Sequence, residues 1–383
     1  MSLENDKFFQ ISNSILNPYI EEWKKDNKKV MGYYCTYLPE ELIHAAGFLP
    51  FRIRATGSQD TDLGDVYMVR FTCSFVRMTL NVALNGGFDF LDGLIMSNCC
   101  DHARRMHEVF DLKVFSRKEF KQKPSQFYTV IPHVITEAGF DYFKNKILKL
   151  KEEIEKKYNL EPISDEKLNL AIEIYNENRK LLREIYELRT IDSPKLTGSE
   201  ALQISMANSS IPKEIANNEL KRVLNILRER EGLKSNKKRI MLIGSVLDNT
   251  YFTKTIENAG GEIVADFICF GTRNIFDDIE LKGGSNPMEE ITKRVYYRIS
   301  CPRMMDDHPR RLKFIEERIK EAKVDGVIVQ RINNCDLHGC ENMNLQYDLK
   351  ELDIPVFNID RENFQKDTSR MQNRIEAFIE MMK

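Results

Sequence analysis

The chain has 383 residues, of which 42% are hydrophobic, so it is long enough for two or three domains with buried cores. The chain has 57 basic and 59 acidic residues, so it lacks the excess of positive charge that is typical of proteins that bind nucleic acid or an anionic membrane. No apolar run reaches the roughly 18 residues of a membrane span, and no secretory signal begins the chain. We therefore expect a cytoplasmic protein whose thiols stay reduced.

The first 139 residues predict a helical lead-in at 1–28 and a first α/β domain at 29–139. Short runs rich in Val and Ile, separated by helical segments, are typical of parallel strands in an open α/β sheet. The predicted strands are 29–35, 49–54, 91–97, 112–116 and 127–131, with helices at 39–47 and 75–87.

The remaining residues predict a helical linking region at 140–236 and a second α/β domain at 237–383. In the linking region, apolar residues recur at three- and four-residue spacing, as on an amphipathic helix. The second domain has predicted strands at 239–246, 262–269, 325–332 and 354–360. Its predicted helices are 250–261, 309–323 and 341–352, and an amphipathic helix ends the chain.

Four of the eight cysteines stand where an apolar run gives way to polar residues: Cys35, Cys99, Cys100 and Cys335. Ligands of open α/β sheets bind beyond the carboxyl ends of the strands. Eight cysteines in a reducing compartment favour metal or redox chemistry over disulfides, although one or two are expected to be ordinary buried residues. The thiols are thus predicted to face a binding crevice.

Two of these positions share a local pattern. SNCCDHARRM and NNCDLHGCEN each place Cys-Asp at a strand end, just before a helix, at Cys100 and Cys335. Anions are favoured at a helix N-terminus, and a thiolate-ligated iron–sulfur cluster is an anion. Cys73, in RFTCSFV, also precedes an amphipathic helix. Three thiolates from separate elements can hold one cubane with an iron left open, although the ferredoxin spacing is absent.

The ordered set of segments from about residue 30 to the end resembles the 2-hydroxyacyl-CoA dehydratase and benzoyl-CoA reductase component family. The resemblance rests on KVMGYYCTYLPEELIHAAGFLPFRI, Cys73, LDGLIMSNCCDHARRM, RIMLIGSVLDN, IENAGGEIVADFICFGTR, NNCDLHGCEN and IPVFNIDRE. It implies two flavodoxin-like (Rossmann-like) parallel-sheet domains plus a helical segment. It also implies an iron–sulfur cluster held by Cys73, Cys100 and Cys335, and electrons from a separate ATP-dependent iron–sulfur activator protein.

The sequence departs from a simple dehydratase subunit by two further cysteines, Cys301 and Cys340. With Cys35 they bring the candidate ligands to six, the number that the double-cubane branch of the family needs. The cofactor is therefore predicted to be a 4Fe–4S cubane or an 8Fe–9S double cubane. Cys269 is interpreted as structural or as a neighbour of the cluster. Cys99 is expected to point away from Cys100 and to be packed.

Other polar residues leave several roles open. His338 lies between two candidate ligands and is either a proton-transfer group or a hydrogen-bond donor to cluster sulfur. With Cys335 and Cys340 it could also form part of a zinc site, but the chain has no Cys-x-x-Cys pair. The Gly-Ser turn of GSVLDN (244–249) suits a phosphate or thioester oxygen. Arg104 and Arg105 could bind a CoA phosphate or an acidic partner, but a solvated helix face is favoured.

The predicted activity is low-potential, one-electron reduction by a double-cubane-type reductase of small molecules. The alternative within the family is a subunit of a 2-hydroxyacyl-CoA dehydratase, with an acyl-CoA substrate. Outside it, a non-catalytic electron-transfer protein or a zinc-stabilised protein remains possible. The amphipathic helices at 140–160, 165–189 and 365–383 predict a subunit interface as well as intrachain packing. A homodimer is expected, with a heterodimer of related chains as the alternative.

Overall fold

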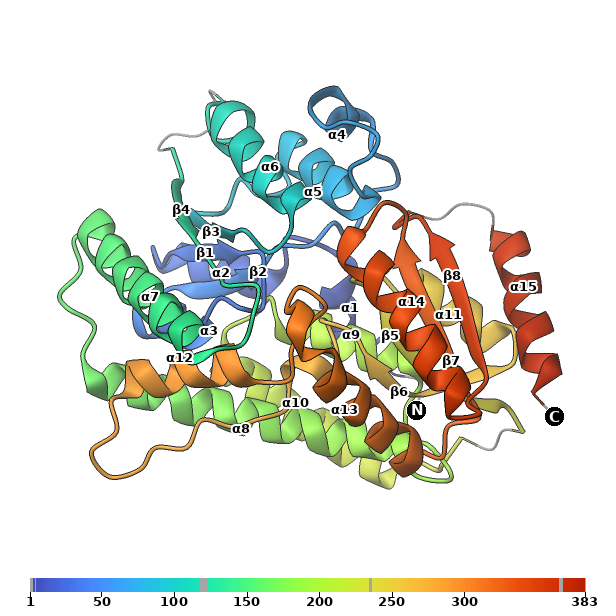
Figure 1. The fold of residues 1–383 in the computed structure, drawn as a ribbon. Helices are drawn as coiled ribbons and strands as arrows, with labels where there is room; N and C mark the ends of the chain where they lie inside the picture. Colours follow the sequence, from blue (N-terminus) through green and yellow to red (C-terminus); the bar gives the residue numbers. More distant parts are fainter. Residues whose placement is uncertain (1–2, 4, 118–122, 234–235, 365–367, 383) are drawn as a thin grey trace.

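The protein is described by a computed structural model that covers all residues except 1–2, 4, 118–122, 234–235, 365–367 and 383. Two parallel sheets, each of four strands, lie side by side in the described residues, with helices packed on their faces (Figure 1). The predicted fold class, two parallel-sheet α/β units with a helical part, is confirmed. The predicted residue boundaries between the domains stay a prediction.

The first sheet has the strand order β2-β1-β3-β4, and all of its pairs are parallel. Its strands are β1 Val30–Tyr33, β2 Leu49–Arg52, β3 Gly93–Ser97 and β4 Ser125–Thr129. The second sheet repeats this arrangement with the order β6-β5-β7-β8. Its strands are β5 Lys238–Gly244, β6 Gly261–Phe267, β7 Gly326–Ile332 and β8 Val356–Arg361.

Helices connect and cover the strands. Those before and within the first sheet are α1 Lys7–Gln10, η1 Ile11–Asn13, α2 Pro18–Lys25, α3 Glu40–Ala45, α4 Asp62–Tyr67, α5 Ser74–Leu84, α6 Asp101–Val109 and η2 Phe110–Val114. Four helices follow between the sheets: α7 Glu137–Tyr158, α8 Asp165–Thr190, α9 Gly198–Asn208 and α10 Lys213–Glu229. The second sheet carries α11 Tyr251–Asn258, η3 Thr272–Asn274, α12 Pro287–Tyr297, η4 Met305–Asp307, α13 His308–Glu321, α14 Asp336–Glu351 and α15 Thr368–Met381.

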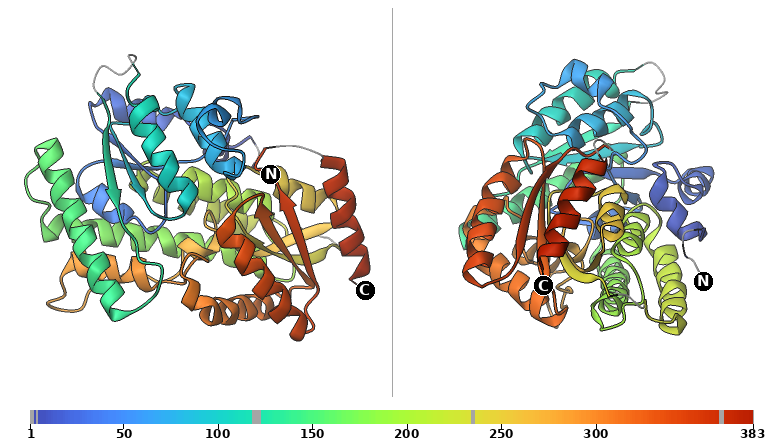
Figure 2. Two further views of the ribbon diagram at one scale, coloured as in Figure 1. Left: turned by 45° about the horizontal axis from the view of Figure 1, so that its top comes forward. Right: turned by 90° about the vertical axis from the view of Figure 1, so that its right-hand side faces the viewer.

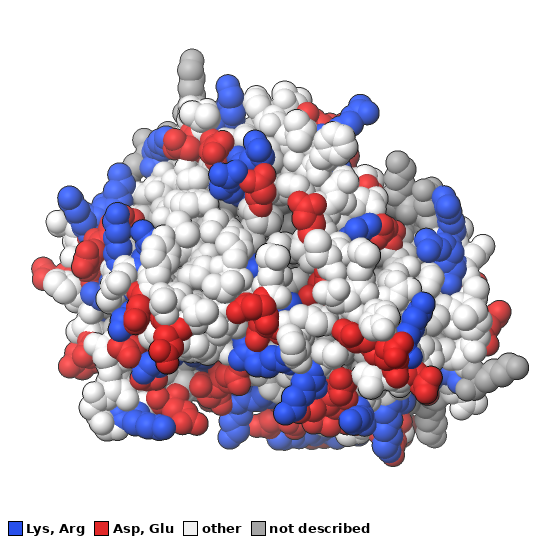
Figure 3. Space-filling model, viewed as in Figure 1, with Lys and Arg blue, Asp and Glu red and all other residues white. Residues whose placement is uncertain are grey.

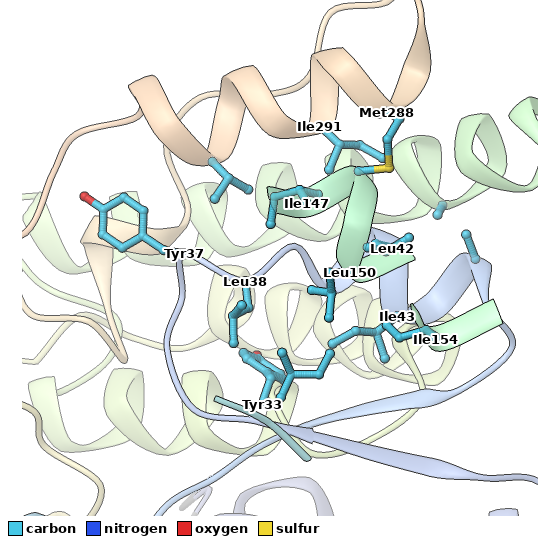
Figure 4. Close-up of a cluster of buried hydrophobic side chains, with 14 of the residues drawn as sticks. Tyr33, Tyr37, Leu38, Leu42, Ile43, Ile147, Leu150, Ile154, Met288 and Ile291 are labelled. Atoms are coloured by element: carbon cyan, nitrogen blue, oxygen red, sulfur yellow. The ribbon is translucent and has the colours of Figure 1, made fainter. Parts of the chain in front are cut away.

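The hydrophobic cores lie on both faces of both sheets. One face of the first sheet packs against α3, α7 and α8, and Figure 4 shows Leu150 and Ile154 of α7 beside Leu42 and Ile43 of α3. The opposite face packs against α5 and α6. In the second sheet, α9, α11 and α15 cover one face and α13 and α14 the other (Figure 2). Helices on both faces leave the carboxyl ends of the strands as the open edge of each sheet.

Two predicted elements differ from the structure. The sequence predicts a strand at 112–116, but Phe110–Val114 is a π-helical continuation of α6. The reason is spacing, since Phe110 and Val114 are both buried and recur at helical spacing. The helix predicted at 341–352 begins earlier, at Asp336, and α12 has no counterpart among the predicted helices. No helix among the described residues is both long enough and apolar enough to span a membrane.

Candidate cysteine-lined site

The carboxyl ends of the two sheets face a common inner cavity of about 140 Å³. Its wall combines strand ends, loops and helix starts from both halves of the chain. Seven of the eight cysteines line it: Cys35, Cys73, Cys99, Cys100, Cys269, Cys301 and Cys335. Most of the remaining wall is apolar, from side chains such as Phe75, Phe270 and Ile332. Thiols that are far apart in sequence therefore converge, as their positions at strand ends predicted.

Local structure explains how the three thiols predicted for one cubane reach this cavity. Cys73, Cys100 and Cys335 are the N-cap residues of α5, α6 and α14. The backbone N–H of Ala103 donates to the Cys100 Sγ at 3.4 Å, and the Cys73 N–H donates to the His102 Nδ1 at 3.3 Å. An N-cap sulfur lies beside the free N–H groups of the first helical turn, where negative charge is stabilised.

The same three cysteines also line a second, outer hollow of about 360 Å³. The outer hollow adds polar residues from the starts of α6 and α14, including Asp101, Arg104 and His102. The inner cavity and the outer hollow thus share Cys73, Cys100 and Cys335 as a common boundary. A group held by these thiols would be approached from the outer side through the hollow.

Cys35, Cys99 and Cys100 form a chain of interacting thiols. A hydrogen bond with Cys99 lowers the pKa of Cys35 to about 6, and Arg303 acts in the same direction. Hydrogen bonding with Cys99 also lowers the pKa of Cys100. We expected Cys99 to point away, but β3 ends at Ser97, so strand alternation does not extend to residue 99. Cys99 therefore lines the cavity, although the alternating side-chain directions of a longer strand would have turned it away.

Three further cavity thiols, Cys73, Cys301 and Cys335, have pKa values above the ordinary value for a thiol. Burial raises the pKa of Cys73 well above its ordinary value and that of Cys335 to about 11. Burial also raises the pKa of Cys301, against the opposing effect of Arg273. A metal centre would supply the charge that makes such thiols deprotonate on binding. These sites therefore suit ligation better than free thiol reactivity.

Cys340 is the exception among the predicted ligands. It is exposed and does not contribute to the cavity wall, because α14 begins at Asp336 and carries residue 340 onto an outer part of the helix. The expectation that Cys340 shares a cavity with Cys35 and Cys301 is therefore not met in this geometry. Cys269, interpreted from sequence as a neighbour of the cluster, does line the cavity.

Three arginines line the cavity, and sequence reasoning assigned none of them a role: Arg52, Arg273 and Arg303. The Arg52 guanidinium donates to the Cys269 carbonyl at 2.6 Å and to its Sγ at 3.0 Å. Arg303 donates to backbone carbonyls, including that of Ile131 at 3.0 Å. Within the part of the chain that the structure describes, no Asp or Glu lines the inner cavity. The sequence does contain a signal for these residues, because the three arginines follow strands or lie in loops, as the cavity cysteines do.

Buried positive charge of this kind needs an anionic partner. Thiolates and the anionic cluster they hold would provide it, so the residues present fit an iron–sulfur centre. Among the described residues, no three His, Cys, Asp or Glu side chains gather closely enough for a single metal ion. A cluster of several irons is larger and takes thiols spread around a cavity.

His338 lines the inner cavity from the first turn of α14 and is 7% exposed. Its Nδ1 has no hydrogen-bond partner among the described residues. Burial, with Arg273 and Arg311, lowers the pKa of His338 to about 3, so the imidazole is neutral at physiological pH. A neutral ring has one N–H donor and one acceptor nitrogen, so both roles predicted for His338 stay predictions.

Two further sequence candidates have structural explanations. Arg104 and Arg105 both pair with Asp101 at 2.6 and 3.0 Å on the exposed face of α6, as the solvated-face interpretation expected. In GSVLDN, Ser245 lines the inner cavity, whereas the Asp248 carboxylate accepts hydrogen bonds from the Ala55 N–H and from Asn363. That turn therefore joins the two halves of the chain beside the cavity.

Comparison with known proteins shows the family to which this chain belongs. A family model described as 2-hydroxyglutaryl-CoA dehydratase, D-component, matches residues 35–382. The (R)-phenyllactyl-CoA dehydratase beta subunit of Clostridium sporogenes is 27% identical over 99% of each chain. A benzoyl-CoA reductase subunit of Thauera aromatica is 27% identical over 82% of this chain and 81% of its own. The lactoyl-CoA dehydratase subunit beta of Anaerotignum propionicum is 22% identical over 97% of this chain and 98% of its own.

Proposed function

Because the chain belongs to the 2-hydroxyglutaryl-CoA dehydratase D-component family, we propose that it is an iron–sulfur enzyme for low-potential reduction of small molecules. Its relatives are named as dehydratases and a reductase, so the chain belongs to a family of enzymes. The observation that carries the proposal is the convergence of seven cysteines on one cavity with no carboxylate in the described part of its wall. Three thiols suffice for one cubane, so seven support the double-cubane alternative.

In this proposal the thiols fall into two sets. Cys73, Cys100 and Cys335 hold the part of the cofactor that borders the outer hollow. The inner set contains Cys35, Cys99, Cys269 and Cys301, and Cys269 is already engaged by the Arg52 guanidinium. One of these inner thiols takes the ligand role that the sequence predicted for Cys340. When bound, the cluster supplies one-electron reduction at a potential that acid–base groups cannot provide.

The protein's own residues provide binding and exclusion of water. Phe75, Val76, Phe270 and Ile332 give the inner cavity an apolar wall, which keeps solvent from the sulfur atoms. Arg52 and Arg303 are fixed by hydrogen bonds and add positive charge beside thiolates. The neutral His338 imidazole can hold a hydrogen-bond acceptor in place.

Iron and sulfide counts on anaerobically purified protein test this function. About eight irons per chain indicate a double cubane and about four a single cubane. The second measurement is turnover after mixing with an ATP-hydrolysing iron–sulfur activator, ATP and a reductant. We expect activity only with all three. Stoichiometric zinc without iron, or full activity with a weak reductant alone, would contradict the proposal.

A second candidate function is that of a component of a 2-hydroxyacyl-CoA dehydratase. It is favoured by the names of the relatives, which include dehydratase beta subunits matched over nearly the whole chain. A single cubane, and activity that appears only after addition of a related second subunit and an acyl-CoA, would select this candidate. An active homodimer that reduces small molecules would select the first. Sedimentation of the purified chain distinguishes a homodimer from a chain that awaits a related subunit.

The activator is proposed to bind at an apolar strip next to the outer hollow. The strip contains exposed side chains on and after α4, including Val66, Val69 and Phe71, which are 69%, 66% and 79% exposed. It directly precedes Cys73, and Asn334, next to Cys335, donates to the Arg70 carbonyl at 3.3 Å. The surface over α4 is largely uncharged in Figure 3, whereas both charge signs mix along the lower edge. Contiguous exposed apolar surface of this kind marks interaction sites.

The strip can be tested by Phe71→Asp. We expect a loss of activator-dependent turnover of about tenfold or more, with unchanged iron content, because a charge would replace the most exposed apolar contact. Leu170→Asp, on the exposed side of α8 and 56% exposed in the wild type, is the matched control. If Phe71→Asp instead changes the sedimentation of the chain alone, the strip is a subunit interface.

A further inference from the structure

Arg273 differs from the other arginines that line the inner cavity. It lies in η3, just after β6, and is 5% exposed. Its Nε and Nη1 have no hydrogen-bond partner among the described residues. The guanidinium of Arg303, by contrast, donates to several backbone carbonyls, and that of Arg52 donates to Cys269. Two buried guanidinium nitrogens whose N–H groups have no acceptor are costly, so the site is built for an acceptor that binds there.

The position of Arg273 is fixed independently of any such acceptor. Its guanidinium carbon lies 5.5 Å from the ring centroid of Phe267, and the Arg298 guanidinium donates to the Arg273 carbonyl at 3.0 Å. The guanidinium is therefore supported by β6, and the backbone of Arg273 by the segment after α12. A donor that is held in place before the ligand arrives loses little entropy on binding.

A second polar side chain with an unpartnered nitrogen lines the same cavity from another element. His338, on α14, has a buried Nδ1 without a partner among the described residues. Arg273 and His338 interact electrostatically, and Arg273 also acts on the Cys301 thiol. Two buried polar groups, one after β6 and one after β7, thus face the cavity near Cys301. As far as the chain is described, the cavity wall holds no carboxylate to accept from them.

We propose that Arg273 donates hydrogen bonds from Nε and Nη1 to a sulfur atom of the centre bound on the Cys301 side of the cavity, with His338 as an auxiliary donor. This inference rests on the proposed iron–sulfur function. Hydrogen bonds and positive charge beside the sulfurs stabilise the more negative, reduced state of a cluster. Arg273 is therefore a positioning residue that raises the reduction potential of the centre.

The same N–H groups could instead donate to the oxygen of a small anionic substrate. The two possible acceptors, cluster sulfur and substrate oxygen, predict different experimental results. A donor to cluster sulfur changes the potential of the resting protein, with no substrate present. A donor to substrate leaves that potential unchanged and alters only binding of the substrate. Redox titration of the isolated protein separates them.

The experiment compares Arg273→Gln and Arg273→Lys with the wild type after anaerobic reconstitution with iron and sulfide. Iron content is measured first, and the midpoint potential is then followed by electron paramagnetic resonance during a mediated redox titration. We expect Arg273→Gln to shift the potential downwards and Arg273→Lys, which keeps the charge but loses the planar fork, to shift it less. Arg331→Gln is the control, because Arg331 carries the same charge near Cys335 but lies at the surface, paired with Asp360.

Each outcome decides between the alternatives. A fully loaded Arg273→Gln protein with the wild-type potential and spectrum would overturn the proposal in favour of a substrate or structural role. If Arg273→Gln loads no iron, Arg273→Lys decides: a loaded protein with a lowered potential supports the proposal, and an unchanged potential overturns it. An equal shift in Arg331→Gln would mean that general charge, not the hydrogen bonds, sets the potential. A wild-type chain that binds no iron would overturn the proposed function itself.

Discussion

The two halves of the molecule use the same strand order but supply different chemistry to the site they share. In each sheet the third strand along the chain, β3 or β7, leads to a Cys-Asp pair at the start of a helix. The first half adds Cys35, Cys73 and Cys99 to the cavity. The second adds Cys269 and Cys301, together with two of the three arginines and the histidine.

This division means that neither half contains a complete site. The first half contributes four of the seven cavity thiols and only one of the arginines. The second half contributes most of the positive charge that offsets them. Because the thiols and the cations meet only when the halves pack together, the cavity depends on their contact, including the Asp248 turn that binds Ala55 and Asn363. Breaking either half should therefore damage the same centre.

The largest effect is expected from the two equivalent N-cap cysteines. Cys100→Ser and Cys335→Ser should each lose most of the bound iron, because each removes one thiolate from the boundary between the inner cavity and the outer hollow. Cys340→Ser is the matched control and should retain iron, since Cys340 is exposed and outside the cavity wall. Iron and sulfide analysis measures all three. Iron loss in Cys340→Ser as well as in Cys100→Ser and Cys335→Ser would restore the ligand set expected from sequence.

A large effect on stability is expected from two buried ion pairs, one in each half. Arg179 of α8 forms an ion pair with Glu41 of α3 at 2.7 Å. Arg311 of α13 forms an ion pair with Glu341 of α14, also at 2.7 Å. Replacing either arginine by Met removes the arginine partner of a buried carboxylate, although His308 stays 3.2 Å from Glu341, and should cost about 3–5 kcal/mol of unfolding free energy. Denaturant unfolding measures this cost.

The two pairs should differ in their effect on the site. Arg311 also donates to the Ser300 hydroxyl at 2.9 Å and to the Met304 carbonyl at 2.7 Å, so it holds the loop that bears Cys301. Arg311→Met should therefore lower iron content, whereas Arg179→Met should lower stability alone. Equal iron loss in both variants would show that iron binding follows global stability.

A smaller effect is expected from glycines in the equivalent strands β1 and β5. Gly244 ends β5 with φ of 133°, and an added Cβ would overlap the Gln330 carbonyl oxygen. Gly244→Ala should cost about 3 kcal/mol. At Gly32 of β1 the nearest atoms are side-chain methyl groups at 3.0–3.1 Å, which can move, so Gly32→Ala should cost about 1 kcal/mol. Equal costs in denaturant unfolding would contradict this difference.

The sequence predicted the fold well because its strands are short apolar runs with clear helical segments between them. The convergence of Cys35, Cys100 and Cys335 followed from one topological rule about strand ends. Other site features depend on where elements begin and end. Cys340 lies outside the cavity wall because α14 starts at Asp336, and Cys99 reaches the cavity because β3 ends at Ser97, before strand alternation would turn it away. Ligation by either residue stays a prediction. The lining arginines were missed because a buried cation has no periodic pattern of its own.

The smallest effect is expected at Glu257, a half-buried carboxylate whose pKa shifts in the opposite direction to that of the buried Glu41. Burial raises the pKa of Glu257 above its ordinary value of 4.5, although Ser199 hydrogen bonds oppose this shift. For Glu41, burial opposes ionisation, but Arg179 overcomes it and the pKa is lowered. The folded state therefore binds the Glu257 proton more tightly than the unfolded state does, and the Glu41 proton less tightly.

Linkage gives the two groups opposite effects on stability against pH. The contribution of Glu257 is present below pH 4.5 and is lost as the pH rises through its raised pKa. The contribution of Glu41 is present above pH 4.5 and is lost as the pH falls through its lowered pKa. Glu257→Gln should then be as stable as the wild type or more stable at neutral pH, by less than about 1 kcal/mol, and Glu41→Gln less stable. Unfolding measured between acid and neutral pH tests both, and stability changes of the same sign would contradict the opposite pKa shifts of Glu257 and Glu41.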